Sequence, residues 1–321
     1  MNTPIPTLTT KTFWIKLNDS QLLLVHGPDA NKFLQGQVTC DLRELNDQIT
    51  RIGAQCNPKG RILLTFRALQ IDPETIALRI PASMLTVAKQ SLGKYIVFSK
   101  AKLVDGQGDY HLYGLYGEQA HTVANALFSC LPTDNEAFIE NEGNFLIQLD
   151  TNRYECWIPA SNNEIFSHKL AACAKQEELD KWSLLDIQAG IASIYPETHE
   201  QFTPQEINYQ LVNAISFRKG CYTGQEIVAR LHYRGKLKRH MYRFTTLSEQ
   251  PPLPGDEVIN SVSGQPAGQV VMATKVNAGE IEILASVFDE QLDELTLVMG
   301  SQKLKRCLLP YAIPTADEKN E

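Results

Sequence analysis

The sequence predicts an α+β fold in which a duplicated core precedes a small C-terminal β-barrel. A strand, a glycine and a helical pattern follow one another at Gly27 and again at Gly117, which suggests a repeated unit. After Gly235, short strands recur between turns rich in proline and glycine, as is typical of a small barrel. A chain of 321 residues is long enough for two or three hydrophobic cores.

The elements of the first half follow from hydrophobic periodicity. Residues 13–26 alternate and then become a continuous apolar run, which predicts a strand. Gly27-Pro28-Asp29 begins a helix that ends at residues 35–37. The remaining elements are a hairpin of residues 49–56 and 61–71 around Asn57-Pro58-Lys59-Gly60, a strand at 76–80, an amphipathic helix at 82–95 and a strand at 96–98.

The second half repeats this order. Strands are expected at residues 110–116, 145–149 and 153–158, with helices at 120–128, 164–174 and 180–192. Residues 193–216 have few periodic apolar positions, so we expect a long functional loop. The later strands are residues 240–246, 257–260, 268–273 and 280–287. The expected domains are a core of residues 1–239, a barrel of 240–312 and a disordered tail of 313–321.

Composition indicates a soluble globular protein, with 43% hydrophobic and 21% charged residues. The polar start has no apolar block and no run reaches the roughly 18 residues of a membrane helix, so we expect a cytoplasmic protein without a membrane partner. The seven cysteines form no Cys-x-x-Cys motif and have no zinc spacing. Free thiols are therefore expected, without a metal site.

The net charge of −7 argues against a general nucleic-acid coat, but the basic residues are unevenly placed. Residues 218–240 contain seven arginines and lysines against one acid, Glu226. A charge run is usually a solvated face. Because this one adjoins an unusual loop, it is also a candidate for contact with an anionic ligand or RNA.

That loop is residues 219–226, Lys-Gly-Cys-Tyr-Thr-Gly-Gln-Glu. Thr223 and Glu226 have the spacing of a capping box ahead of apolar residues, which predicts a helix over 224–233. Cys221 then lies just before a helix N-terminus, with Lys219 beside it, where a thiolate is favoured. Gly220 and Gly224 bracket the cysteine and leave its backbone uncovered. The alternative is that Cys221 is a small buried apolar residue.

The pattern Lys-Gly-Cys-Tyr-x-Gly-Gln-Glu resembles the signature of YgfZ-type folate-binding proteins, bacterial relatives of the glycine-cleavage aminomethyltransferase (T-protein). Residues 35–42, Gln-Gly-Gln-Val-Thr-Cys-Asp-Leu, and Ile-Ser-Phe at 215–217 resemble the same family. The resemblance spans roughly residues 15–310. It implies an aminomethyltransferase-like, pseudo-symmetric core, a C-terminal Greek-key β-barrel and a central cavity for tetrahydrofolate.

The resemblance also implies site residues. Of two tryptophans that line the family's folate site, Trp182 matches the second, whereas the first position falls on Ser20. Trp14 does not align with it. Tyr222 and Gln225 would shape the site, and Lys219 would hold the Cys221 thiolate or an anionic ligand.

Two departures argue against aminomethyl transfer. The T-protein's aspartate position falls on Leu63 or Leu64, which cannot accept a proton, and Gln188 stands where relatives often carry glutamate. The family is associated with iron–sulfur cluster maintenance and, through cluster enzymes, with tRNA modification, so we expect Cys221 to be the functional thiol. Two alternatives stay open: a folate-gated scaffold for an iron–sulfur enzyme or RNA, and a residual one-carbon transferase.

Overall fold

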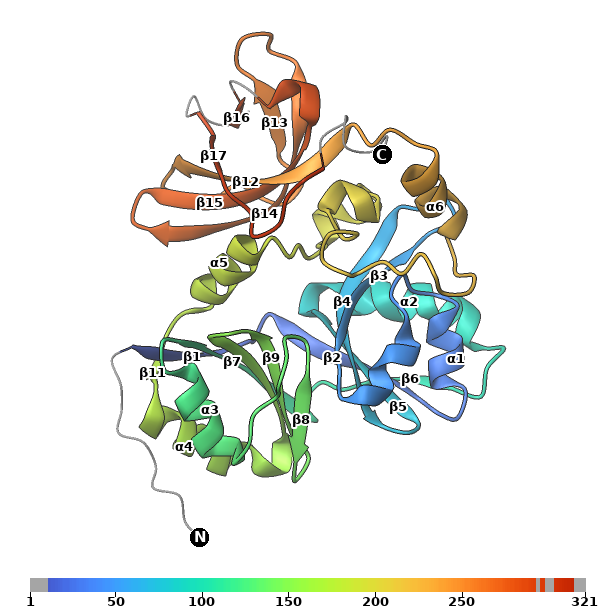
Figure 1. Ribbon diagram of the computed structural model, residues 1–321, viewed down its shortest axis with the longest axis vertical. Helices are drawn as coiled ribbons and strands as arrows, with labels where there is room; N and C mark the ends of the chain where they lie inside the picture. Colours follow the sequence, from blue (N-terminus) through green and yellow to red (C-terminus); the bar gives the residue numbers. More distant parts are fainter. Residues whose placement is uncertain (1–10, 293–294, 298–302, 315–321) are drawn as a thin grey trace.

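The protein is built from three sheets with helices packed around them (Figure 1). This computed structural model describes residues 11–292, 295–297 and 303–314, so most of the predicted tail lies outside the described residues. In the described part, no helix is long and apolar enough to cross a membrane.

The first sheet has the strand order β3-β4-β5-β2-β6. Its strands are β2 (Ser20–His26), β3 (Arg51–Cys56), β4 (Ile62–Asp72), β5 (Thr75–Pro81) and β6 (Lys102–Asp105). Helices α1 (Ala30–Gln35) and α2 (Leu85–Ile96) and the short helices η1 (Leu42–Asp47) and η2 (Ala82–Met84) accompany it. The predicted hairpin is confirmed as β3 and β4, which pair antiparallel.

The second sheet has the order β11-β1-β7-β10-β9-β8. Its strands are β1 (Thr12–Lys16), β7 (Tyr110–Gly117), β8 (Phe138–Asn141), β9 (Asn144–Asp150), β10 (Arg153–Pro159) and β11 (Lys175–Gln176). Helices α3 (Ala120–Phe128) and α4 (Asn163–Cys173), with η3 (Ala160–Asn162) before α4, complete this unit.

The two sheets repeat one pattern. Gly27 and Gly117 both have positive φ, at 135° and 119°, and each links a strand to a helix. A Cβ at either position would collide with a backbone carbonyl, that of Lys100 or of Lys11. Ile-Pro-Ala-Ser also occurs twice, at residues 80–83 and 158–161, each time between a strand and a helix. The expected duplication is therefore present.

Two sequence predictions are corrected by the structure, the first because the units exchange their first strands, β1 and β6. β1 joins the second sheet although β2 belongs to the first, so residues 13–26 form two strands that separate at a turn at Asn18 and Asp19. The predicted strand at 96–98 is also wrong. Helix α2 continues to Ile96, and Val97 and Phe98 are 72% and 89% exposed, so they have no sheet to join.

Helix α5 (Leu179–Ala189) lies between the second and third sheets (Figure 1). Lys181 donates to the carbonyl of Val276 at 2.8 Å, and Thr274 donates to the carbonyl of Asp180 at 3.3 Å. The loop that follows contains only η4 (Pro196–Thr198) and η5 (Pro204–Ile207) before α6 (Gln225–Tyr233). The core of the first sheet continues under this loop through Phe202, and into α6 through Val228.

The third sheet is antiparallel, with the order β16-β13-β14-β15-β12-β17. Its strands are β12 (Arg239–Leu247), β13 (Glu257–Asn260), β14 (Pro266–Asn277), β15 (Glu280–Phe288), β16 (Leu295–Leu297) and β17 (Lys305–Cys307), with η6 (Asp289–Gln291) after β15. The four predicted strands are confirmed, but the barrel is not closed. Over the described residues its edge strands have three residues each and do not pair, and one backbone bond, Leu304 to Leu295, joins the two edges.

Candidate functional site

The loop of residues 219–226 is fixed along its length to residues 35–42. The buried Lys219 ammonium donates to the carbonyls of Val38 and Cys40 at 2.8 and 2.6 Å. The amide of Thr223 donates to the carbonyl of Gly36 at 3.2 Å. Burial lowers the pKa of Lys219 to about 8, because a desolvated ammonium is less stable. The two motifs thus form one structural unit.

Gly224 fixes the junction between the loop and α6. Its φ is 85°, and a Cβ there would lie 2.5 Å from the carbonyl oxygen of Asn57. On the opposite side of this contact, a Cβ on Gly60 would lie 2.8 Å from Ile227. The β3–β4 hairpin therefore packs directly against the start of α6, and both glycines are needed for that approach.

The predicted helix is confirmed, but the capping box is wrong. The N-cap of α6 is Gly224, and no side chain caps it. The Thr223 hydroxyl instead points to Gln37 Oε1, at 3.5 Å, and Glu226 is exposed. The turn is closed by Gln225. Its backbone N–H donates to the carbonyl of Tyr222 at 3.1 Å, and its side-chain Oε1 accepts from the backbone N–H of Tyr222 at 3.3 Å.

Cys221 is exposed, whereas Lys219 before it and Tyr222 after it are buried. Lys219 lies beneath the loop, 5.2 Å from the centre of the Tyr222 ring. Burial raises the pKa of Tyr222, with the nearby sulfurs of Cys56 and Cys40 adding to it. Lys219 and Tyr222 therefore hold the loop from below, and the thiol of Cys221 is left on the surface.

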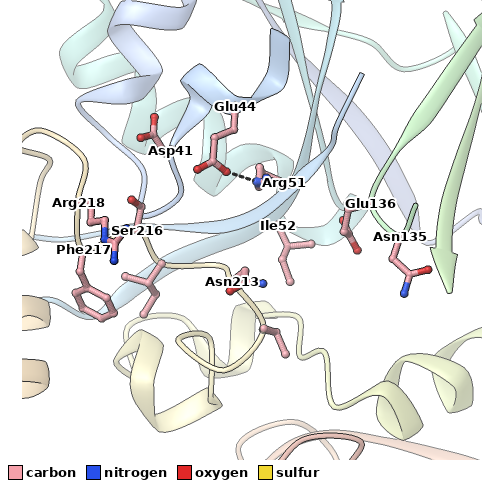
Figure 2. A pocket seen from close by; sticks show the side chains of 12 residues that line it. Asp41, Glu44, Arg51, Ile52, Asn135, Glu136, Asn213, Ser216, Phe217 and Arg218 are labelled. Carbon is pink, nitrogen blue, oxygen red and sulfur yellow. Dashed lines mark hydrogen bonds and ion pairs between the residues drawn. The ribbon is translucent and has the colours of Figure 1, made fainter. Parts of the chain in front are cut away.

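A cavity of about 570 Å³, called the outer cavity here, opens beside this loop (Figure 2). Its lining comes from the end of the long loop, from η1 and β3, and from the segment before β8. The lining residues are Asp41, Glu44, Arg51, Ile52, Asn135, Glu136, Val212, Asn213, Ile215, Ser216, Phe217 and Arg218. Arg51 is paired with Glu44 at 2.5 Å, whereas Arg218 forms no ion pair with any residue in the described ranges. The cavity thus combines apolar, amide and charged groups.

A second space of only about 30 Å³, the inner cavity, lies between the two core sheets. It shares Ile52 with the outer cavity, and the ion pair of Arg67 with Glu136 stands between them, since each partner lines one space. Arg79, Glu155 and Asp186 line its polar side. The two spaces are therefore neighbours separated by one ion pair.

Buried charges join the sheets around the inner cavity. Arg79 Nε of β5 is 3.4 Å from Glu155 Oε1 of β10, and Arg153 donates to Asp186 of α5 at 2.8 Å. Burial raises the pKa of Asp186, against the attraction of the arginines. These residues were missed in the sequence. The available signal was a charged residue inside an otherwise apolar strand, as at Arg79 and Glu155.

The predicted folate residues occupy two places. Trp182 is buried against Gly114, with the Arg153 guanidinium 5.4 Å from its ring centre, and its Nε1 has no hydrogen-bond partner in the described part of the chain. Ser20 pairs with Pro81, which lines the inner cavity. Tyr222 and Gln225 lie instead in the loop before α6. Trp14 packs in a different cluster from Trp182, with Tyr113 and Phe166.

The positions that argued against aminomethyl transfer lie in β4 and α5. Leu64 is fully buried, and Leu63 lines a third cavity of about 480 Å³ beside Cys56 and Tyr95. Gln188 donates to Glu282 at 3.2 Å, which links α5 to the third sheet. Within the described residues, no group of three or more His, Cys, Asp or Glu side chains could hold a metal ion.

Comparisons with known proteins identify the family. No family model matches the chain. The protein is 33% identical to the tRNA-modifying protein YgfZ of Hamiltonella defensa over 90% of this chain and 87% of that protein. It is 35% identical to that of Photobacterium profundum over 88% and 85%, and 34% identical to that of Yersinia pseudotuberculosis over 93% and 92%.

The fold is also that of a solved enzyme. Aminomethyltransferase T of the glycine cleavage system from Bartonella henselae superposes with a TM-score of 0.72 over 95% of this chain and 87% of the enzyme, at 16% identity. This likeness concerns the fold, and it matches the aminomethyltransferase-like core expected from the sequence. From the full-length identities to the curated relatives, the chain belongs to the YgfZ family of tRNA-modifying proteins.

Proposed function

We propose that this protein acts in tRNA modification as a folate-binding protein that maintains iron–sulfur clusters, with Cys221 as its functional thiol. Membership of a family named for tRNA modification supports the first part. The observation that carries the second is the exposed thiol of Cys221 on a loop that is fixed from below by Lys219. A thiol held in this way is open to another macromolecule.

Cys221 supplies one sulfur ligand to a cluster in transit, and the partner enzyme supplies the others. Thiolates are the usual ligands of iron–sulfur clusters. The rigid attachment of the loop favours this role, because the backbone on both sides of the sulfur does not have to be ordered when the partner binds. A Cβ placed on Gly220 would meet no heavy atom of the described residues within 4 Å, so the partner can approach the backbone there.

The outer cavity is the proposed site for tetrahydrofolate. Its volume of about 570 Å³ lies within the usual range of small-molecule sites, about 300–1,000 Å³. Phe217 and Ile52 offer apolar surface to a flat ring, Asn213 and Glu136 offer polar groups to its edge, and Arg218 is available to a glutamate carboxylate. When bound, the folate supplies one-carbon or redox chemistry beside the loop.

The inner cavity adds a second reason for a ligand with hydrogen-bond acceptors. Arg79 lines it, and its Nε has only the long 3.4 Å ion pair with Glu155, while Trp182 Nε1, which is buried outside the lining, lacks a hydrogen-bond partner among the described residues. An unpaired buried donor costs roughly 1–3 kcal/mol. An acceptor of about the size of one water molecule that entered past Glu136 would give Arg79 Nε a better hydrogen bond.

The thiol is tested in extracts of cells that lack this protein and are complemented with variants. We expect Cys221→Ala to lose the support of a cluster-dependent tRNA-thiolating enzyme, and Cys130→Ala, which removes another exposed thiol, to keep it. Both variants should bind tetrahydrofolate as the unchanged protein does. Full support by Cys221→Ala would refute the role of the thiol.

Folate binding is tested by calorimetry with tetrahydrofolate. We expect saturable binding that weakens about tenfold in Arg218→Ala, because a hydrogen bond to a charged group contributes about 1.5–3 kcal/mol. Lys169→Ala, an exposed cation on α4, should bind normally. Absence of saturable heat would contradict the folate part of the proposal and leave the thiol part standing.

A further inference from the structure

Three aromatic rings form a small cluster on the surface at α6. Phe217 stacks on His232 with ring centres 3.7 Å apart and planes at 12°. Tyr233 packs edge-on to both rings, at 4.7 Å from His232 and 6.1 Å from Phe217. Tyr233 is nevertheless 67% exposed. Such a side chain is held in place by its neighbours yet keeps much of its surface open, which suits the stacking of another flat ring.

Five exposed cations lie close to this cluster in the chain. They are Arg218, Arg230, Arg234, Lys236 and Lys238. None of them forms an ion pair with another described residue, whereas Arg61, Arg153 and Arg243 elsewhere are each paired with a carboxylate. In a chain of net charge −7, a group of unpaired cations is a local positive field that attracts anions.

The surface is continuous with the site already described. Phe217 both stacks on His232 and lines the outer cavity, and Arg218 lines it too. Cys221 lies between these residues and α6 in the chain. Whatever binds the cluster therefore lies next to the cavity and to the loop that carries the exposed thiol.

We infer that α6 and its flanks, residues 217–238, bind RNA directly and take an unpaired base onto Tyr233. Single-stranded RNA and RNA loops are bound by exposed aromatic rings next to unpaired cations. Every base has a flat face that can stack on a ring, and every phosphodiester linkage carries a negative charge. An acidic protein would satisfy the cations but would make no use of an exposed ring beside them. The inference rests on the proposed role in tRNA modification and extends it. The protein would contact the RNA itself as well as support an enzyme.

The test measures the fluorescence anisotropy of labelled RNA on titration with the full-length protein. The probes are a short single strand, a stem-loop and a blunt duplex of equal length. We expect the single strand and the stem-loop to bind, with affinity that falls as salt rises, and the duplex to bind more weakly. If none of the probes binds, or if the duplex binds as well as the single strand, the inference fails.

Two variants separate stacking from charge. Tyr233→Ala should weaken binding to the single strand about 5- to 150-fold, the value of one base–aromatic stack. The double variant Arg230→Ala with Arg234→Ala should reduce the slope of log K against log salt by about 1.4, roughly 0.7 for each lost phosphate contact. All three side chains are exposed, and circular dichroism checks that the fold is retained.

Matched controls come from another part of the chain. Phe98→Ala removes a ring that is 89% exposed but has no ring contact among the described residues. It should leave RNA affinity unchanged, and a loss equal to that of Tyr233→Ala would overturn the inference. Cys130→Ala, which removes an exposed thiol outside residues 217–238, should bind RNA normally. The RNA measurement contains no iron–sulfur enzyme, so a failure of RNA binding can be told apart from a failure of the thiol proposal.

Discussion

At the scale of single residues, the seven cysteines differ sharply in burial, which separates buried thiols from exposed ones. Burial raises the pKa of Cys40 and of Cys56 to about 12 and also raises the pKa of Cys156 and Cys173. Cys221 and Cys130 are exposed. Because the thiolate is the nucleophile, the buried cysteines should be inert in the folded protein.

Alkylation of the native protein tests this division. With iodoacetamide at neutral pH, we expect Cys221 and Cys130 to be labelled, and Cys40, Cys56 and Cys156 to react only after unfolding. Peptide mass spectrometry with and without denaturant gives the answer. Rapid labelling of Cys40 or Cys56 in the native protein would mean that the contact between the loop and residues 35–42 opens readily.

Lys219 makes stability depend on pH. Its folded pKa, about 8, is below the ordinary value of 10.5, so the unfolded chain binds more protons between these values and stability rises with pH there. Relative to Lys219→Met, the protein should gain on the order of 3 kcal/mol from pH 8 to pH 10.5. Denaturant unfolding measures this. As a control, the unchanged protein should show no such gain relative to Lys236→Met, which changes an exposed lysine and keeps Lys219. Parallel curves for Lys219→Met and the unchanged protein would contradict the assignment.

The sequence indicated that Lys219 matters but not how. Its nearness to Cys221 in the chain suggested a partner for the thiolate. In the fold its ammonium instead reaches carbonyls about 180 residues away, those of Val38 and Cys40. A contact of this kind depends on tertiary structure, and chain position alone cannot reveal it.

At the scale of elements, the two glycines of the loop have different tasks. Gly224 has a φ of 85° and no room for a Cβ, whereas a Cβ on Gly220 would meet no described atom within 4 Å. We expect Gly224→Ala to lower the free energy of unfolding by about 1–3 kcal/mol or more and Gly220→Ala to change it by less than about 0.5 kcal/mol. Thermal or urea unfolding compares them, and equal losses would contradict the packing of the hairpin on α6.

Local patterns predicted the existence of elements better than their ends. The turn residues 57–60 correctly predicted the hairpin, and Ile227 and Val228 correctly predicted α6. The capping box failed because Gly224 is held against Asn57, so the turn closes through Gln225 and leaves Thr223 facing Gln37. A tertiary contact has overridden the local preference.

At the scale of the whole molecule, ion pairs rather than apolar packing alone join the two core sheets around the inner cavity. Glu155 is 1% exposed and interacts with Arg79 of the other sheet. Glu155→Gln should cost about 3–5 kcal/mol, because the charge of Arg79 loses its partner. Lys175→Ala, which breaks an exposed pair with Glu177, should cost less than about 1 kcal/mol. The double variant Arg79→Met with Glu155→Gln should cost less than the sum of its single changes, and strict additivity would show that the pair is not coupled.

The duplication was visible in the sequence at Gly27 and Gly117, but the exchange of β1 and β6 between the units was not. Apolar alternation identifies a strand without naming its sheet, so residues 13–26 were predicted as one continuous strand. That the third sheet stays open could not be predicted from the sequence either, because strand spacing does not determine whether edge strands pair. The inner cavity follows from the arrangement of both units and has no local signature.

The attachment of Lys219 and Thr223 to residues 36–40 has a practical consequence for protein engineering. A chimaera that received only residues 219–226 would carry Cys221 on an unanchored segment. Its Lys219 would lack the carbonyl acceptors that hold it here. A working transplant into a related scaffold also requires residues 36–40 and the hairpin turn that contains Gly60. The smallest portable module is therefore discontinuous, assembled from three stretches of chain.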